Sequence, residues 1–151
     1  MRTYFQAGGS LNKGFVGQIS YTVCLDKEYK GMNIEFSFNK QRITAVSEEM
    51  KSEFLNAYGD KYGISNYSDE ELNSAILEMK TEIHTLVTMN DEFIGGVHKQ
   101  LTTRHMTFTP DFTSDGCIPQ TGIAGVLKII LVVFNVIMDN TDYQLTLTVE
   151  D

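Results

Sequence analysis

Cysteine is scarce in this sequence, and the way it occurs argues against the classes of protein built on it. Cys24 and Cys117 lie far apart, and neither stands in a CxxC or Cys/His spacing. The pattern argues against a secreted disulfide framework and against a zinc site. We expect two ordinary reduced thiols, with a single bridge between them as the alternative.

A long hydrophobic run is also missing. The most apolar stretch, residues 126–138, is interrupted by Lys128 and Asn135, whereas a membrane helix needs about 20 largely apolar residues. The opening residues, MRTYFQAGGSLNKG, hold no apolar segment of a secretory leader. These absences predict a soluble, cytoplasmic protein that does not bind a membrane.

Positive charge is in short supply. The chain has 12 Lys and Arg against 20 Asp and Glu, a formal net charge of -8, and no basic cluster. Such a surface repels a phosphate backbone, so we expect no nucleic-acid partner.

Nothing in the sequence divides it into parts. It has no proline-rich linker, internal repeat or low-complexity segment, and its 151 residues are 42 % hydrophobic, with seven tyrosines and nine phenylalanines. A chain of this size and composition buries one core without a disulfide or metal. The prediction is a single domain over residues 1–151.

Alternation of apolar and polar residues with a period of two predicts most of the chain as β-strands. The clearest case places Met32, Ile34 and Phe36 on one face. The expected strands are 3–6, 15–24, 32–39, 93–99, 101–109, 126–138 and 143–150. We expect hairpins between the second and third strands and between the last two, with strand 126–138 central and covered on both faces.

The period changes to that of helices in the middle of the chain. Ser47 is a candidate N-cap for a helix over 47–59 that Gly59 ends. Ser68 and Glu71 form a capping box for a second helix, and apolar residues at helical spacing extend it over 68–89. The predicted fold is α+β: an antiparallel β-sandwich or curled sheet with a two-helix insertion between N-terminal and C-terminal strands.

The charge is concentrated in this insertion. Residues 47–91 contain ten acids and three lysines, and so carry -7 of the net -8. One interpretation is a solvated outer face on two amphipathic helices. The other is a docking surface for a basic partner, to which the candidate acids are Glu48, Glu49, Glu70 and Glu71.

Three tyrosines surround the expected interhelical loop: Tyr58, Tyr62 and Tyr67. They either form a stacking platform for a sugar or peptide or pack the loop against the body.

A divalent-metal site is the alternative hypothesis. His98 and His105 meet if the strands that carry them form a hairpin, and Asp111 or Asp115 would complete the ligand set. Their spacing lacks the specificity of HExxH or paired CxxC motifs. A calcium loop beginning at Asp60 is excluded because its required glycine is Ser65.

No catalytic pattern outweighs a structural explanation of the same residues, so the sequence does not determine the function. The leading hypothesis is a non-enzymatic binding or assembly module without a cofactor, with a protein or small-molecule partner. The alternative is a small metal-assisted hydrolase or isomerase that uses His98 and His105. A third possibility is a homo-oligomer formed through the strand 126–138.

Overall fold

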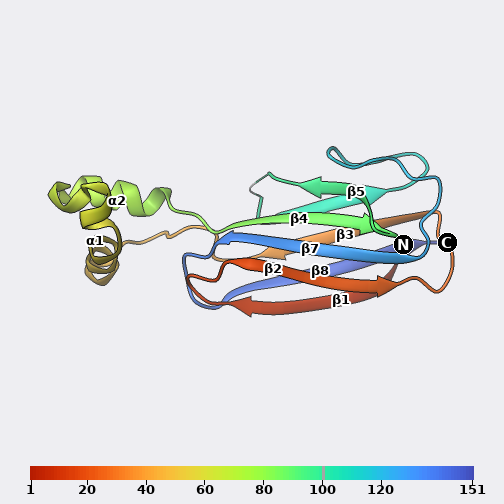
Figure 1. Ribbon diagram of the computed structural model, residues 1–151, viewed down its shortest axis with the longest axis horizontal. Coiled ribbons are helices and arrows are strands. Elements are labelled where there is room, and N and C mark those ends of the chain that lie inside the picture. The colour runs from red at the N-terminus through yellow and green to blue at the C-terminus, as the bar shows by residue number, and fades with distance from the viewer. Residues whose placement is uncertain (100) are drawn as a thin grey trace.

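The predicted α+β class is confirmed, with two antiparallel sheets packed face to face (Figure 1). The computed structural model describes residues 1–99 and 101–151, and within them eight strands form two four-stranded sheets. The first sheet has the order β1 (Arg2–Leu11), β8 (Thr141–Glu150), β3 (Gly31–Phe38), β6 (Thr103–Phe108). The second has the order β2 (Gly17–Cys24), β7 (Val126–Asn135), β4 (Glu82–Met89), β5 (Glu92–Val97). This is the strand order of a jelly roll, which winds two Greek keys into a double sheet.

Both predicted hairpins are wrong because successive strands change sheets. β2 pairs with β7, whereas β3 pairs with β8 and β6. β7 and β8 are each internal, but in different sheets. Alternation along a strand fixes which residues face the core, not which strand lies beside it. β4 and β5 do form a hairpin, through Asn90 and Asp91 with φ of 52° and 66°, the positive values of a tight hairpin turn.

The core fills the space between the sheets with alternate residues of their strands. Phe36 of β3 and Leu145 of β8 come from one sheet, and Ile83 of β4 and Ile129 of β7 come from the other. Each is at most 1 % exposed. Full burial of such a side chain stabilises the fold by about 1.5–3 kcal/mol.

β7 is shorter than predicted, and only one of its faces is fully buried. It ends at Asn135, and only the face that carries Leu127, Ile129 and Leu131 is fully buried. On the outer face, Val126 is 37 % and Phe134 is 49 % exposed. The expectation that structure covers this strand on both sides is therefore wrong.

The second helix is shorter than predicted. α2 spans Asp69–Glu78, and residues 82–89, which were expected to continue it, form β4. Ile83 and Leu86 match helical spacing by coincidence. The β-branched Ile83, Thr85 and Val87 alternate, and these are the residues that β4 buries. The predicted capping box of Ser68 and Glu71 is confirmed.

The first helix, α1, spans Glu48–Tyr62 and begins at the predicted N-cap, where Ser47 Oγ accepts a hydrogen bond from Met50 N at 3.2 Å. It runs past Gly59 and ends at Gly63, whose φ of 67° lies in the left-handed region that glycine adopts with least strain. A short 3-10 turn, η1 (Ile64–Asn66), leads to α2. Figure 1 shows both helices projecting from one end of the sandwich, opposite the chain termini. Among the described residues, no helix is long and apolar enough to cross a membrane.

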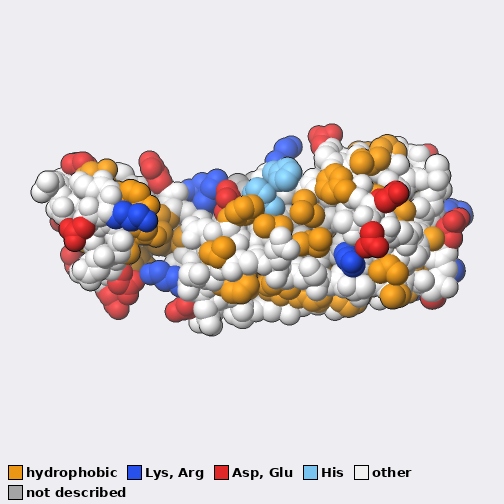
Figure 2. Space-filling view, viewed as in Figure 1, with side chains coloured by type: hydrophobic (Ala, Val, Ile, Leu, Met, Phe, Trp, Pro, Cys, Tyr) orange, Lys and Arg blue, Asp and Glu red, His pale blue; other side chains and the backbone are white. Residues whose placement is uncertain are grey.

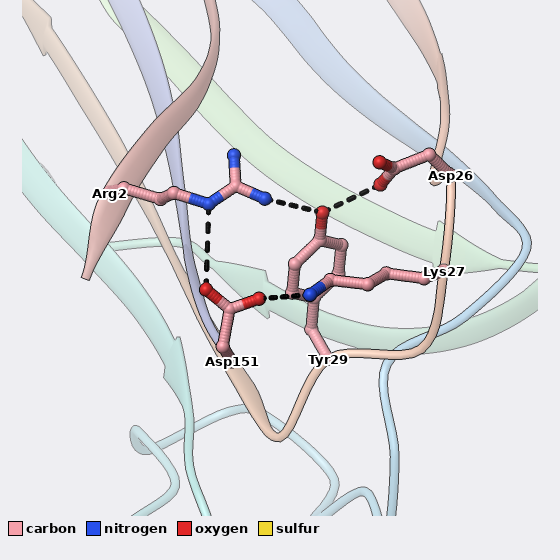
Figure 3. Close-up of polar contacts among 5 residues, drawn as sticks. All are labelled: Arg2, Asp26, Lys27, Tyr29 and Asp151. Atoms are coloured by element: carbon pink, nitrogen blue, oxygen red, sulfur yellow. Dashed lines mark hydrogen bonds and ion pairs between the residues drawn. The ribbon is translucent and has the colours of Figure 1, made fainter.

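A polar network closes the end of the sandwich where the termini lie (Figure 3). The hydroxyl of Tyr29 donates to Asp26 Oδ1 at 2.6 Å and accepts from Arg2 Nη2 at 2.8 Å. Asp151 pairs with both Arg2 and Lys27. The network therefore ties β1, the β2–β3 loop and the C-terminal residue together. Its partners are far apart in the sequence, and no local pattern marks them.

Candidate binding groove

The helices join the sandwich through a neck formed by residues 39–47 and 79–81. Within it, Thr81 N donates to Gln41 O at 2.9 Å, and Arg42 and Lys80 form an isolated β-bridge. Thr81 is fully buried, and its hydroxyl accepts from Ile137 N at 3.1 Å. The neck is therefore fixed to the segment that joins β7 to β8.

A small hydrophobic cluster then sets the orientation of the helices. Ile76 of α2, Ile43 of the neck and Ile137 of the β7–β8 loop are 1 %, 8 % and 4 % exposed. Met50 and Phe54 of α1 pack against them. This cluster is separate from the core between the sheets, so the helices have their own docking contact.

A groove lies at this junction, and we call it the junction groove. Its volume is about 250 Å³, and its walls are mostly apolar. One wall is the face of α1 that carries Met50, Phe54, Ala57 and Tyr58, a spacing that places them on one side of a helix. The other lining residues are Lys13, Ile43, Glu53, Ile76, Met79, Ile137, Met138 and Asp139.

A second, open hollow shares Phe54, Tyr58 and Met79 with the groove, and we call it the tyrosine surface. It brings together the three tyrosines that the sequence singled out, and its lining residues are Phe54, Tyr58, Tyr62, Ile64, Tyr67, Ala75, Met79 and Asn135. The ring centroids of Phe54 and Tyr58 lie 5.2 Å apart, and those of Tyr58 and Tyr62 lie 5.9 Å apart. Tyr62 is 62 % exposed. Figure 2 shows hydrophobic side chains gathered where the helices meet the sandwich, with acidic side chains around the outside of the helices.

The four predicted acids lie near the N-termini of the two helices. Glu48 accepts a hydrogen bond from Lys51 at 3.0 Å, and this bond raises the pKa of Lys51. Glu49 is exposed in the same turn. Glu70 and Glu71 line a shallow hollow beside Tyr67, but Glu71 also accepts from Ser68 N at 3.3 Å in the capping box. Glu71 therefore supports the helix itself.

Most of the net negative charge lies on the helices. Residues 48–78 hold eight acids and two lysines, a net -6, whereas the neck carries Lys40, Arg42 and Lys80. The predicted -7 over 47–91 included residues of β4. The charged surface is thus smaller than the sequence indicated and lies beside the tyrosine surface.

The histidines are not arranged as the metal hypothesis requires. β5 and β6 lie in different sheets, so the expected hairpin between His98 and His105 does not form. His98 lies against His84, while His105 pairs with Glu35 at 3.7 Å. Asp115 lines the same open hollow as His98 and His105, and Asp111 does not. Among the described residues, no three His, Cys, Asp or Glu side chains are grouped to hold a metal ion.

The two cysteines are free thiols, Cys24 exposed and Cys117 half-buried. Cys117 lies against β5, where a Cβ on Gly95 would approach its Sγ to 2.6 Å. Burial raises the pKa of Cys117. A raised pKa lowers the thiolate fraction at neutral pH, which disfavours a nucleophilic role.

Comparison with known protein families gives a match over the whole chain. A family of unknown function, DUF6669, matches residues 1–151. No curated protein and no solved structure matches the chain. The match spans the sandwich and the helical insertion alike, so the chain belongs to the family DUF6669 over its whole length.

Proposed function

We propose that this protein is a non-enzymatic binding module whose helices receive a basic, partly apolar segment of a partner protein. The observation that carries the proposal is the tyrosine surface: Tyr58, Tyr62 and Tyr67 are each at least 39 % exposed and line one hollow. Exposed aromatic side chains that gather in one place are typical of binding surfaces.

The size of the junction groove favours peptide side chains over a whole small molecule. Its volume of about 250 Å³ lies below the roughly 300–1,000 Å³ of most small-molecule sites. One or two apolar side chains fill such a space as anchors. Met50, Met79 and Met138 line it, and methionine adapts its shape to different apolar partners.

The negative charge of the helices favours a partner segment that also carries lysine and arginine. The helices around the tyrosine surface carry a net -6, which attracts lysine and arginine and speeds encounter with them. Because this attraction acts across solvent, it should weaken as salt is added.

A synthetic amphipathic peptide of lysine and leucine with one tryptophan tests the proposal. The protein has no tryptophan, so the fluorescence of the peptide alone reports binding. We expect saturable binding that a Tyr58→Ala, Tyr62→Ala double variant weakens at least about tenfold, the loss of 1.4 kcal/mol or more typical of interface anchors. Phe112→Ala is the matched control, since Phe112 is 59 % exposed in the distant β6–β7 loop. Binding that is equal in all three proteins would contradict the proposal.

The outer face of the second sheet supports a second candidate, self-association. Phe134 is 49 % and Phe93 is 51 % exposed, and side-chain atoms of Leu86 and Phe93 both lie within 3.6 Å of the position that a Cβ on Gly96 would take. A sheet face of four strands, each about eight residues long and about 4.8 Å from the next strand, covers roughly 500 Å². Two copies would bury about 1,000 Å² in total, the lower end of specific interfaces. We therefore expect a weak dimer.

Sedimentation tests this candidate. A dimer that forms at high micromolar concentration and is lost in Phe134→Glu supports it. A monomer throughout that range counts against it.

We also propose a cytoplasmic location, which fits two free thiols in a reducing compartment. Cell fractionation that finds the protein outside the cytoplasm would overturn this.

A further inference from the structure

Two histidines that the proposed function does not use lie together on the outer face of the second sheet. In the β4–β5 hairpin Thr85 pairs with Val97, so the neighbouring residues 84 and 98 are opposite each other. The Nδ1 atoms of His84 and His98 are 3.1 Å apart, and their rings meet edge to face at 72° with centroids 4.9 Å apart. Histidine side chains are visible on this face in Figure 2.

The separation of these nitrogens suits a shared metal ion. Two nitrogens 3.1 Å apart, each about 2.0–2.1 Å from an ion, subtend roughly 100° at it, close to tetrahedral geometry. The ring of Phe134 packs on His84 at 4.6 Å between centroids and limits its rotation. The two nitrogens are therefore held at a separation that fits two ligands of one ion.

A metal ion needs a lone pair on the ring nitrogen that faces it. Burial and the positive charges of His98 and Arg104 lower the pKa of His84, against the opposing effect of Glu82. A neutral imidazole has a lone pair to offer. When the ion binds, a ring that carries its proton on Nδ1 must carry it on Nε2 instead.

We propose that His84 and His98 form a two-histidine site for a late divalent transition-metal ion. Among the described residues no third His, Cys, Asp or Glu joins a metal-binding group, so the proposed protein ligands are these two imidazoles. Imidazole ligands suit Cu²⁺, Ni²⁺ and Zn²⁺, and Cu²⁺ binds most tightly in the general order of affinities. The site is independent of the tyrosine surface and stands whether or not the helices bind a peptide.

Calorimetric titration of Cu²⁺ into the full chain tests this site, because the chain has only three histidines. We expect one ion per chain and a Kd that rises at least about tenfold in His84→Ala and in His98→Ala. His105→Ala is the matched control and should bind like the unaltered protein, since His105 pairs with Glu35 on the other sheet.

Electron paramagnetic resonance adds a readout of the ligands themselves. The Cu²⁺ spectrum should show coupling to two imidazole nitrogens, and to one in His98→Ala. His98 is exposed, so this variant decides the question even if His84→Ala fails to fold. Absence of one-to-one binding, unchanged affinity in His98→Ala, or an equal loss in His105→Ala would each overturn the proposal.

Discussion

Lys13, in the loop between β1 and β2, reaches α1, where its Nζ lies 2.9 Å from Oε2 of Glu53. Its backbone N donates to Asp139 Oδ1 at 2.9 Å in the β7–β8 loop. All three residues line the junction groove. The ion pair therefore links the sandwich to the helices directly across the groove.

Removing this link should loosen the helices with little effect on stability. Lys13 and Glu53 side chains are 52 % and 53 % exposed, and exposed ion pairs contribute only about 0–1 kcal/mol. We expect Glu53→Gln to change the free energy of unfolding by less than about 1 kcal/mol while amide hydrogen exchange in α1 becomes faster. Glu48→Gln is the control, because Glu48 pairs within α1. Unchanged amide hydrogen exchange of α1 in Glu53→Gln would show that the ion pair does not restrain the helix.

Ile76 should hold the helices to the sandwich. It is 1 % exposed in the docking cluster, and truncation of such a residue costs about 2–5 kcal/mol. We expect Ile76→Ala to release the helices while amide signals of the sheets keep their positions. Leu77→Ala, at a 42 % exposed position of the same helix, should change stability by less than about 0.5 kcal/mol. Loss of the sheet signals in Ile76→Ala would contradict an independent docking contact.

Asp26 should make the fold sensitive to acid. The hydrogen bond from Tyr29 lowers the pKa of Asp26 below 3.8. A carboxyl whose folded pKa is lowered stabilises the fold above its unfolded pKa, and this contribution is lost as pH falls through the folded pKa. Tyr29→Phe should therefore raise the pKa of Asp26 and make unfolding below pH 3.8 less steep.

Carboxyl-carbon NMR titration measures this pKa directly. Tyr67→Phe, at the other end of the molecule, should leave the titration of Asp26 unchanged. A Tyr29→Phe protein whose Asp26 titrates as before would show that the hydrogen bond does not set the pKa.

Arg104 of β6 presents an unusual buried charge. It is 3 % exposed. Its Nε donates to Leu101 O at 3.0 Å and its Nη1 donates to Ile83 O, while Nη2 has no hydrogen-bond partner among the described residues. No carboxylate of the described residues forms an ion pair with it, and its guanidinium lies 5.5 Å from the ring centroid of Phe36. Burial lowers the pKa of Arg104 to about 10. The group therefore remains charged at pH 7.

Replacing Arg104 by an uncharged side chain of similar length should remove the free-energy cost of burying its charge. Burial disfavours the charged form of Arg104, which no carboxylate of the described residues offsets, so Arg104→Met should be at least as stable as the unaltered protein in urea at pH 7. The difference should shrink as pH rises through about 10, where the folded protein releases the proton before the unfolded chain does. Arg104→Ala should be less stable than Arg104→Met because it also leaves a cavity. If Arg104→Met and Arg104→Ala lose the same amount of stability, the charge of Arg104 itself stabilises the fold.

The sequence predicts local features of this fold well because they depend on neighbouring residues. The alternation of Ile34 and Phe36 places them in the core, and the capping box of Ser68 and Glu71 begins α2. Pairing between strands depends on residues far apart in the chain, such as Thr22 of β2 and Lys128 of β7. Periodicity holds no information about such pairs.

The errors in the candidate site have two sources. The hairpin expected to join His98 to His105 does not form, because β5 and β6 lie in different sheets. With residues 82–89 assigned to a helix, His84 was not placed beside His98, although β-branched Ile83, Thr85 and Val87 were a signal for a strand. The tyrosines were found because Tyr58, Tyr62 and Tyr67 surround one short turn. The junction groove was not predicted because Lys13 and Met138 reach it from loops that the chain order separates widely.

Methionine methyl NMR tests the central claim of a binding surface at the helices most directly. The chain has seven methionines; Met50, Met79 and Met138 line the junction groove, while Met32 and Met106 are buried between the sheets. On addition of the lysine and leucine peptide, we predict that the first three methyl signals shift and saturate together while the two core signals stay in place. Groove signals that do not move, or shifts confined to Met1 and Met89, would contradict a binding site at the junction.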